Sequence, residues 1–181
     1  MIAAGYLFKR LALRPEWIKN PNVRDIYSVS GHGSADFADY VNYWKHNGWW
    51  LFNRPGDMIA IVEREGVERS ALTLFYYEVF EQQYNEREKQ WTAIEPEKSF
   101  TTDVEQPASA TLEGYDVVSF FAGSSPECSP LFCNSLADEL PVNEHCLFDS
   151  FDFAKEALEA GKFDNCEPGP YRIFAVYKVS S

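Results

Sequence analysis

Residues 71–84 read Ala-Leu-Thr-Leu-Phe-Tyr-Tyr-Glu-Val-Phe-Glu-Gln-Gln-Tyr and carry the strongest structural signal in the chain. Aromatic and β-branched residues are frequent in this stretch, which is typical of a strand. A polar turn over 85–88 follows it, and residues 89–94 can form the returning strand. The sequence therefore predicts a long antiparallel hairpin near the middle of the chain.

Further strands are expected on both sides of this hairpin. Residues 4–13 and 115–122 are rich in large apolar side chains, and residues 171–179 alternate between apolar and polar positions. Residues 49–52 form a short apolar run, Trp-Trp-Leu-Phe, which is typical of a buried strand. These four segments are further strand candidates.

Three helices are expected between these strands. The first follows the capping residue Ser34 and extends to residue 46, with an apolar stripe on one side. The second begins at Pro55, and the third follows Ser150 and ends before Gly161. Strands and helices do not alternate regularly, so the predicted fold class is α+β: a mainly antiparallel sheet with about three helices packed on it.

The chain has 181 residues, which favours a single globular domain over 1–181. Residues 95–113 contain two prolines and several acidic residues, and we predict an acidic loop there. This loop would join two halves, residues 1–94 and 114–181.

A short sequence echo links these halves. Ser34–Ala38 matches Ser150–Ala154 at four of five positions, and Gly5-Tyr6 matches Gly114-Tyr115. One hypothesis is an ancient duplication that produced two related strand-loop-helix-strand halves. The alternative is that good helix starts resemble one another, because short matches arise often by chance.

The formal net charge of −12 is unevenly distributed. Residues 1–62 contain 7 basic and 5 acidic residues, whereas residues 63–181 contain 9 basic and 23 acidic residues. Such a surface would repel a phosphate backbone or an anionic membrane, so no nucleic acid is expected as a partner. The charge suits a basic protein partner, or simply solubility.

The chain contains no apolar run long enough to span a membrane. The apolar start, residues 1–8, is followed by Lys9 and Arg10 rather than preceded by them, which is the opposite of a secretory signal. The predicted location is therefore the cytoplasm, without a membrane partner. Cysteines are normally reduced there.

The four cysteines all lie in the last third of the chain. Unpaired structural thiols are one interpretation, and a disulfide is another. A structural metal site is a third alternative, although the spacing fits zinc poorly. Its ligands would be Cys128, Cys133, Cys146 and Cys166. No cofactor motif is recognised.

Cys128 and His145 are candidate catalytic residues. Cys128 follows a predicted strand, where reactive groups are often found, and His145 could act as its base. Asp138, Glu139 or Glu144 could orient the imidazole. No local sequence motif of a nucleophile supports this pair.

A glycine-rich loop precedes the first predicted helix. Gly31, His32 and Gly33 could hold an anion at the helix start, where backbone N–H groups are free. Asp36 in the first helical turn would compete with such an anion. The other interpretation is a flexible loop leading to a helix cap.

The aromatic residues form the second candidate binding surface. Trp49 and Trp50 belong to one cluster, and Tyr76 and Tyr77 must point to opposite faces of the hairpin. One face can serve the core. The other packs against the chain's own helices, a partner or a ligand.

Three functions remain as hypotheses. The leading one is a non-enzymatic acidic interaction protein, such as an inhibitor or immunity-type factor that binds a basic partner. The second is a small-molecule enzyme or binder, with a site between the Gly31–Ser34 loop and the Cys128–His145 segment. The third is a structural homodimer.

Overall fold

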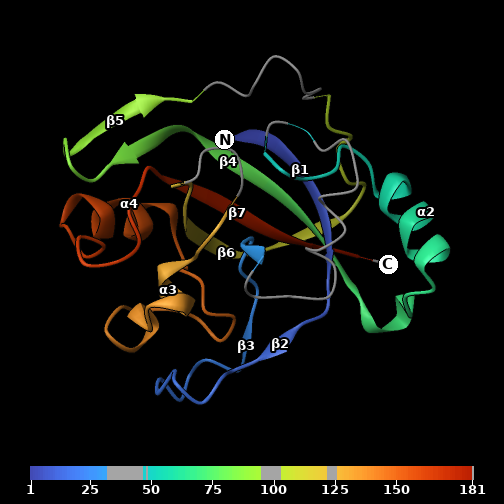
Figure 1. Ribbon diagram of the computed structural model, residues 1–181, viewed down its shortest axis with the longest axis horizontal. Helices are drawn as coiled ribbons and strands as arrows, with labels where there is room; N and C mark the ends of the chain where they lie inside the picture. The colour runs from blue at the N-terminus through green and yellow to red at the C-terminus, as the bar shows by residue number, and fades with distance from the viewer. Residues whose placement is uncertain (32–46, 48, 95–102, 122–125, 181) are drawn as a thin grey trace.

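The computed structural model describes residues 1–31, 47, 49–94, 103–121 and 126–180 (Figure 1). The strands in this part of the chain are β1 (Ile2–Lys9), β2 (Ala12–Leu13), β3 (Asp25–Ile26), β4 (Thr73–Asn85), β5 (Gln90–Ala93), β6 (Ala110–Ser119) and β7 (Tyr171–Val179). The helices are α2 (Pro55–Glu65), α3 (Pro130–Cys133) and α4 (Phe151–Glu159), with 3-10 turns at Arg69–Ala71 and Leu136–Asp138. The predicted fold class, α+β with a mainly antiparallel sheet, is confirmed.

The main sheet has five antiparallel strands. Four of them lie in the order β1-β4-β7-β6, and β5 pairs with the far end of β4. The predicted hairpin is therefore confirmed, with Tyr84 opposite Trp91 in the β4–β5 register. β2 and β3 form a separate two-stranded sheet.

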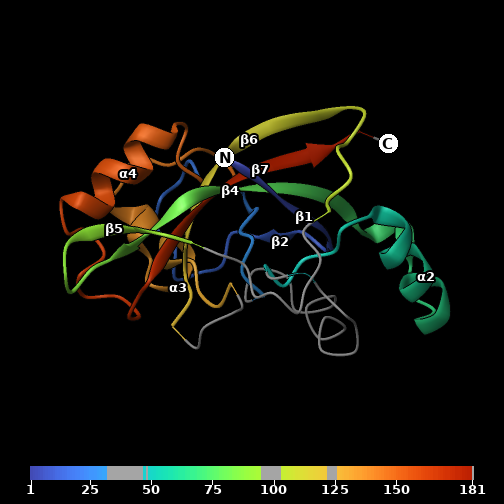
Figure 2. The same ribbon diagram turned by 90° about the horizontal axis from the view of Figure 1, so that it is seen from above.

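The two faces of the main sheet are covered differently. Figure 2 shows α4 on one side of the sheet and β2, β3 and α3 on the other. Phe151 of α4 packs on Phe80 and Tyr115, so these residues lie on the helix side. Because side chains alternate along a strand, Asp116 points to the opposite side. We call that side, which faces β3 and α3, the loop face.

Three consecutive aromatic residues of β4 are buried on both faces of the sheet. Phe75, Tyr76 and Tyr77 are each at most 2% exposed. Tyr76 packs on Tyr6 with ring centroids 5.2 Å apart, and Phe75 packs on Tyr27 at 4.9 Å. The chain's own side chains therefore cover both faces of this strand.

The helices α2 and α4 lie where the sequence predicts them. Met58, Ile61 and Val62 form the buried side of α2, and Gly66 ends it in a left-handed conformation with φ of 66°. Ser150 caps α4, because its Oγ accepts a hydrogen bond from the N–H of Phe153 at 3.2 Å. The predicted helix over 34–46 lies outside the described residues.

Three predicted segments differ from the structure. Residues 49–52 form a turn rather than a strand, because the φ of Trp50 is 58° and only Phe52 pairs, through a single bridge with Tyr6. The predicted strand over 4–13 divides into β1 and β2. β6 begins at Ala110, within the predicted acidic loop.

The same turn closes on both edge strands of the sheet. Asn47 donates from Nδ2 to the carbonyl of Ala4 at 2.7 Å, and Asn143 donates to the carbonyl of Glu113 at 2.7 Å. In both turns the asparagine Oδ1 accepts the backbone N–H groups two and four residues later. The chain then forms a bridge with the edge strand and enters α2 or α4.

Each turn meets a glycine on its edge strand. A Cβ on Gly5 would lie 2.6 Å from the carbonyl oxygen of Phe52, and one on Gly114 would lie 2.7 Å from that of Phe148. Both glycines have positive φ, 132° and 147°, and both sit at a bulge. In this repeated arrangement the counterpart of α4 is α2, whereas the sequence echo at Ser34–Ala38 lies outside the described residues.

The two glycines mark one row of residues across the sheet. Gly5 pairs with Tyr77, Tyr77 pairs with Val176, and Val176 pairs with Gly114. The two turns therefore close on the two strands, β1 and β6, that flank the central β4–β7 pair. No helix in the described part of the chain is long and apolar enough to cross a membrane.

Candidate functional site

The loop face of the sheet holds a buried lysine. Lys9 is the last residue of β1 and is only 1% exposed. Its Nζ donates hydrogen bonds to the backbone carbonyls of Ser28 and Ser30, the second at 2.7 Å. Lys9 therefore holds the chain segment that leaves β3 and leads to Gly31.

A buried carboxylate on β6 holds the same segment from the other side. Asp116 is fully buried, and its Oδ2 accepts hydrogen bonds from the Ser28 Oγ at 2.7 Å and the Val29 N–H at 2.9 Å. Its Oδ1 accepts one from the Ser129 Oγ at 2.6 Å. The Oγ atoms of Ser28 and Ser30 are 2.9 Å apart, and because the single hydroxyl proton of Ser28 goes to Asp116, Ser28 accepts this hydrogen bond from Ser30.

This carboxylate joins two segments that are far apart in the sequence. Ser28 and Val29 lie just before the glycine-rich loop, and Ser129 follows Cys128 directly. A small-molecule site between these two segments is expected from the sequence, and Asp116 bonds to both of them. Gly31 is partly exposed, whereas His32 and Gly33 lie outside the described residues.

Burial changes the protonation of this cluster. Removal from water lowers the pKa of Lys9 to about 7, and the negative charge of Asp116 opposes part of that shift. Burial likewise raises the pKa of Asp116, although hydrogen bonds from Ser129 and Ser28 oppose the rise. Lys9 is therefore an amine that can gain or lose a proton near neutral pH.

A second titratable cluster surrounds His145. Its Nδ1 lies 2.5 Å from Oδ1 of Asp25, and its Nε2 lies 3.5 Å from carboxylate oxygens of Glu113 and Glu144. The imidazole stacks on the ring of Tyr27 with centroids 3.9 Å apart. Of the three carboxylates suggested as orienting groups, Glu144 lies beside the imidazole, whereas Asp138 accepts the N–H groups of residues 19 and 20.

Cys128 and His145 have different partners in the structure. The hydrogen bond with Cys133 and burial raise the pKa of the Cys128 thiol. A thiol with a raised pKa is a poor nucleophile at neutral pH, because the thiolate is the reactive form. Within the described residues, no hydrogen bond joins Cys128 to His145, so the catalytic pair stays a prediction.

The other cysteines are also held as thiols. All four cysteines lie within the described residues, and none forms a disulfide. Burial raises the pKa of Cys146, and it raises the pKa of Cys166 to about 11. In the described ranges, no three His, Cys, Asp or Glu side chains form a metal-binding group, the four cysteines of the alternative metal site included.

The aromatic binding candidates lie mostly inside the protein. Trp49, Tyr76 and Tyr77 are at most 2% exposed, and Trp50 is partly buried. Tyr76 belongs to the helix side of the sheet, whereas Tyr77 and Trp49 lie with the loop-face core. They are placed for core packing and for contact with buried polar groups rather than for a flat external surface.

Sequence reasoning missed Lys9, Asp116 and Arg172. Asp116 and Arg172 are charged residues within apolar strand segments, Tyr115-Asp116-Val117-Val118 and Tyr171-Arg172-Ile173-Phe174, whereas Lys9 ends its strand and is followed by Arg10. A buried charge is costly unless it is paired or used, so such an interruption is itself a functional signal.

The chain was compared with models of protein families, with curated proteins and with solved structures. None of them matches it. A function for the candidate site is therefore inferred from its geometry and chemistry.

Proposed function

We propose that this protein is a small-molecule enzyme or binder whose site lies on the loop face of the sheet, around Lys9 and Asp116. The observation that carries the proposal is the position of Asp116. Its carboxylate accepts hydrogen bonds from both Ser28 and Ser129, and Lys9 holds the carbonyls of the same Ser28 segment.

Removing such a cluster of charged groups from water costs free energy, which a purely structural role does not require. Burial of a lysine and a carboxylate is costly even when both are hydrogen-bonded, so their presence in a core favours a use beyond stability. The Lys9 amine, with a pKa of about 7, would exchange a proton with the bound molecule. Asp116 and the serines would hold the two covering segments in place.

The test is a thermal-shift screen of small polar metabolites on the wild type, on Lys9→Met and on Lys162→Met. Lys162 is an exposed lysine and serves as the matched control. We expect one or more compounds to raise the unfolding midpoint of the wild type and the control but not that of Lys9→Met. A folded Lys9→Met protein that responds to the same compounds as the wild type would contradict the proposal.

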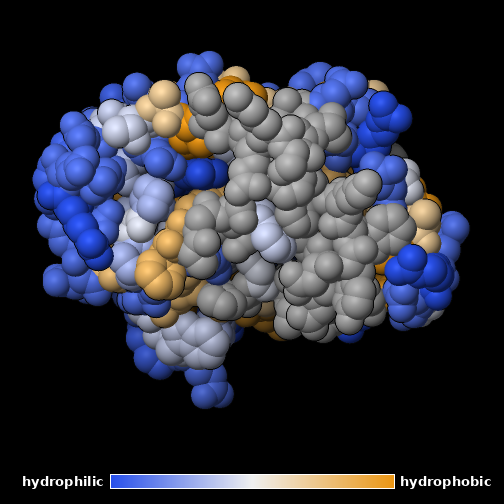
Figure 3. All heavy atoms as spheres, turned by 45° about the horizontal axis from the view of Figure 1, so that its top comes forward, coloured by the Kyte–Doolittle hydropathy of each residue, from blue (hydrophilic) through white to orange (hydrophobic). Residues whose placement is uncertain are grey.

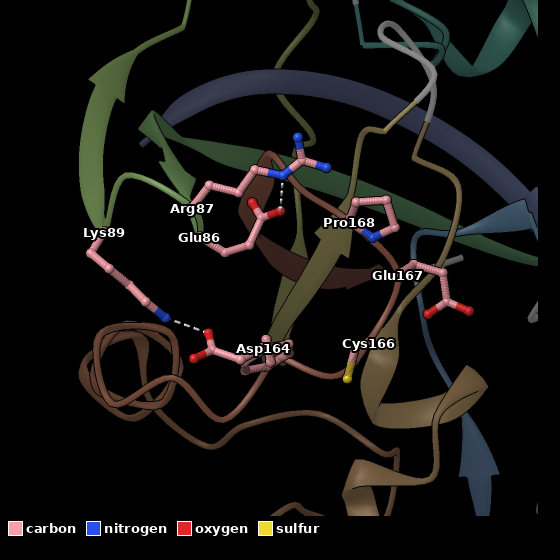
Figure 4. Close-up of a pocket in the computed structure, with 8 residues that line it drawn as sticks. Glu86, Arg87, Lys89, Asp164, Cys166, Glu167 and Pro168 are labelled. Carbon is pink, nitrogen blue, oxygen red and sulfur yellow. Dashed lines mark hydrogen bonds and ion pairs between the residues drawn. The ribbon is translucent and has the colours of Figure 1, made fainter.

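A second candidate function is binding of a basic protein partner, as the charge distribution suggests. Figure 3 shows a largely hydrophilic surface at the end of the molecule that carries α4 and the β4–β5 turn. A hollow of about 320 Å³ opens there, lined by Glu86, Asp164 and Glu167 (Figure 4). Lys89 pairs with Asp164 and Arg87 lies 3.8 Å from Glu86, while Glu167 lies on the opposite side of the hollow from both cations.

This candidate is tested by titrating a lysine-rich peptide at low and high salt. Glu86→Gln/Glu167→Gln should weaken binding at low salt more than Glu63→Gln/Glu65→Gln, which removes the same charge from α2. Equal weakening by both pairs would indicate a general charge effect and no site in the hollow.

A further inference from the structure

Arg172 is the second residue of β7 and lies on the loop face. In the β6–β7 register it pairs with Val118, two residues from Asp116, and alternate residues share a face. Arg172 is 9% exposed. Its guanidinium is therefore nearly removed from water on the same face as the Lys9 cluster.

Two aromatic rings enclose this guanidinium. Its Cζ lies 3.9 Å from the ring centroid of Phe120 and 5.5 Å from that of Trp49. Both rings are fully buried. Stacking of this kind supports the flat faces of the guanidinium and leaves its edge for hydrogen bonding.

Among the described residues, no carboxylate pairs with Arg172. Its Nε donates to Oε1 of Gln83 at 3.3 Å, and no ion pair to Arg172 occurs within the described residues. Burial lowers the pKa of Arg172 to about 10, with no opposing charge. Lys9, by comparison, has Asp116 nearby.

Two further donors on this face are buried without partners among the described residues. They are Nε1 of Trp49, whose ring lies over Arg172, and the hydroxyl of Tyr77. A buried donor left without a partner destabilises a protein, because the group has lost its hydrogen bonds to water. A cation and an indole N–H left unsatisfied side by side indicate a site that a ligand completes.

We propose that Arg172 and Trp49 bind the oxyanion group, a carboxylate or a phosphate, of a small molecule on the loop face. The two Nη groups of Arg172 form a planar fork that matches two oxygens of such a group, and Trp49 Nε1 is a third donor. The inference rests on the proposed function for its claim that this molecule is the substrate or ligand of the Lys9 site. The oxyanion site itself depends only on Arg172 and its surroundings.

The experiment measures the unfolding midpoint of the full chain against inorganic phosphate and, separately, against acetate. Sodium chloride keeps the ionic strength constant, and its chloride serves as the control anion. At about 100 times the dissociation constant, the midpoint of the wild type should rise by about 5–10 °C with at least one oxyanion. The stronger of the two responses identifies the phosphate or the carboxylate as the preferred group.

Three variants make the assignment specific. Arg172→Gln should abolish the response, and Trp49→Phe should weaken binding by about tenfold or more through loss of one charge-assisted hydrogen bond. Arg69→Gln, which changes an exposed arginine outside both candidate sites, should respond like the wild type. If Arg172→Gln does not fold, the oxyanion affinity of Trp49→Phe alone tests the site. A wild type that responds to neither oxyanion, or a Trp49→Phe protein with unchanged affinity, would overturn the inference.

Lys9→Met separates this inference from the proposed function. If it retains the oxyanion response and loses the response to metabolites, both proposals stand. If it retains both responses, the role of Lys9 fails while the oxyanion site stands. If Arg172→Gln still responds to the oxyanion as the wild type does, the oxyanion site fails whatever Lys9 does.

Discussion

Trp49 and His145 occupy the same position in two copies of one turn. Each lies two residues after the turn asparagine and donates its backbone N–H to that asparagine's Oδ1, at 3.0 Å for Trp49 and 2.9 Å for His145. Their side chains then have different surroundings: the indole lies over Arg172, and the imidazole contacts Asp25. The same backbone turn thus positions an indole N–H, that of Trp49, in the first half of the chain and an imidazole, that of His145, in the second.

Replacement of Gly114 by alanine should destabilise the protein by about 2–4 kcal/mol. A Cβ there would meet the carbonyl oxygen of Phe148 at 2.7 Å, and the φ of 147° is strained for any other residue. Chemical denaturation measures the change. Gly56→Ala in α2 is the control, because a Cβ there meets no atom within 4 Å, and it should be neutral or stabilise by about 0.5–1 kcal/mol. Similar losses in both variants would show that the close approach at Gly114 is not the cause.

Asn143→Ala should lower the free energy of unfolding by about 2–3 kcal/mol. It removes a donor to the Glu113 carbonyl and an acceptor for two backbone N–H groups. Asn143→Asp keeps the acceptor but places a second oxygen against the Glu113 carbonyl, so it should not restore stability. Urea denaturation of both variants tests this. Full stability of the aspartate variant would mean that the bond to Glu113 contributes little.

The stability of the wild type relative to Lys9→Met should rise with pH. Burial lowers the pKa of Lys9 to about 7, so between this value and that of an unfolded lysine, about 10.4, the unfolded chain binds more protons than the native one. The difference in unfolding free energy should therefore grow by about 2 kcal/mol from pH 7 to pH 9. Denaturation at a series of pH values measures it, and a constant difference would show that Lys9 keeps an ordinary pKa.

Three native thiols, Cys128, Cys146 and Cys166, should react slowly with iodoacetamide at pH 8. Cys128 and Cys146 are buried with raised pKa values, so they should label only when the protein unfolds. Cys166 is partly exposed, and its pKa of about 11 should make it label about 100 times more slowly than a free thiol. Peptide mass spectrometry identifies the labelled residue. Rapid labelling of Cys128 in the native protein would instead support the catalytic Cys128–His145 pair.

Local patterns in the sequence predict most of the regular elements. The hairpin, α2, α4 and β7 depend on periodicity and on capping residues such as Ser150 and Gly66, which act within a few positions of the chain. Residues 49–52 are different, because their apolar run resembles a strand. Asn47 instead folds this run into a turn, because its Oδ1 accepts the N–H groups of Trp49 and Leu51. Its Nδ2 donates to the carbonyl of Ala4, which is distant in the sequence.

The candidate site is less predictable for the same reason. The sequence indicates the two segments that meet there, through Gly31 and Cys128, but Asp116 joins them only after β6 takes its place in the sheet. The role of Arg172 depends on Trp49 and Phe120, which reach it from separate parts of the chain. The apolar neighbours of Asp116 and Arg172 indicate that these charges are buried, but their partners are fixed only by the assembled sheet.

β4 belongs to the first half of the chain and β7 to the second, and the two strands pair with each other. Each half on its own would therefore have one strand edge that lacks its partner. Tyr76 pairs with Tyr177 and Tyr77 with Val176, so the seam runs along the middle of one continuous sheet. If residues 1–94 and 114–181 were produced as separate polypeptides, each would present an unpaired strand with a free row of backbone donors and acceptors. When mixed, the two fragments should then associate by pairing β4 with β7.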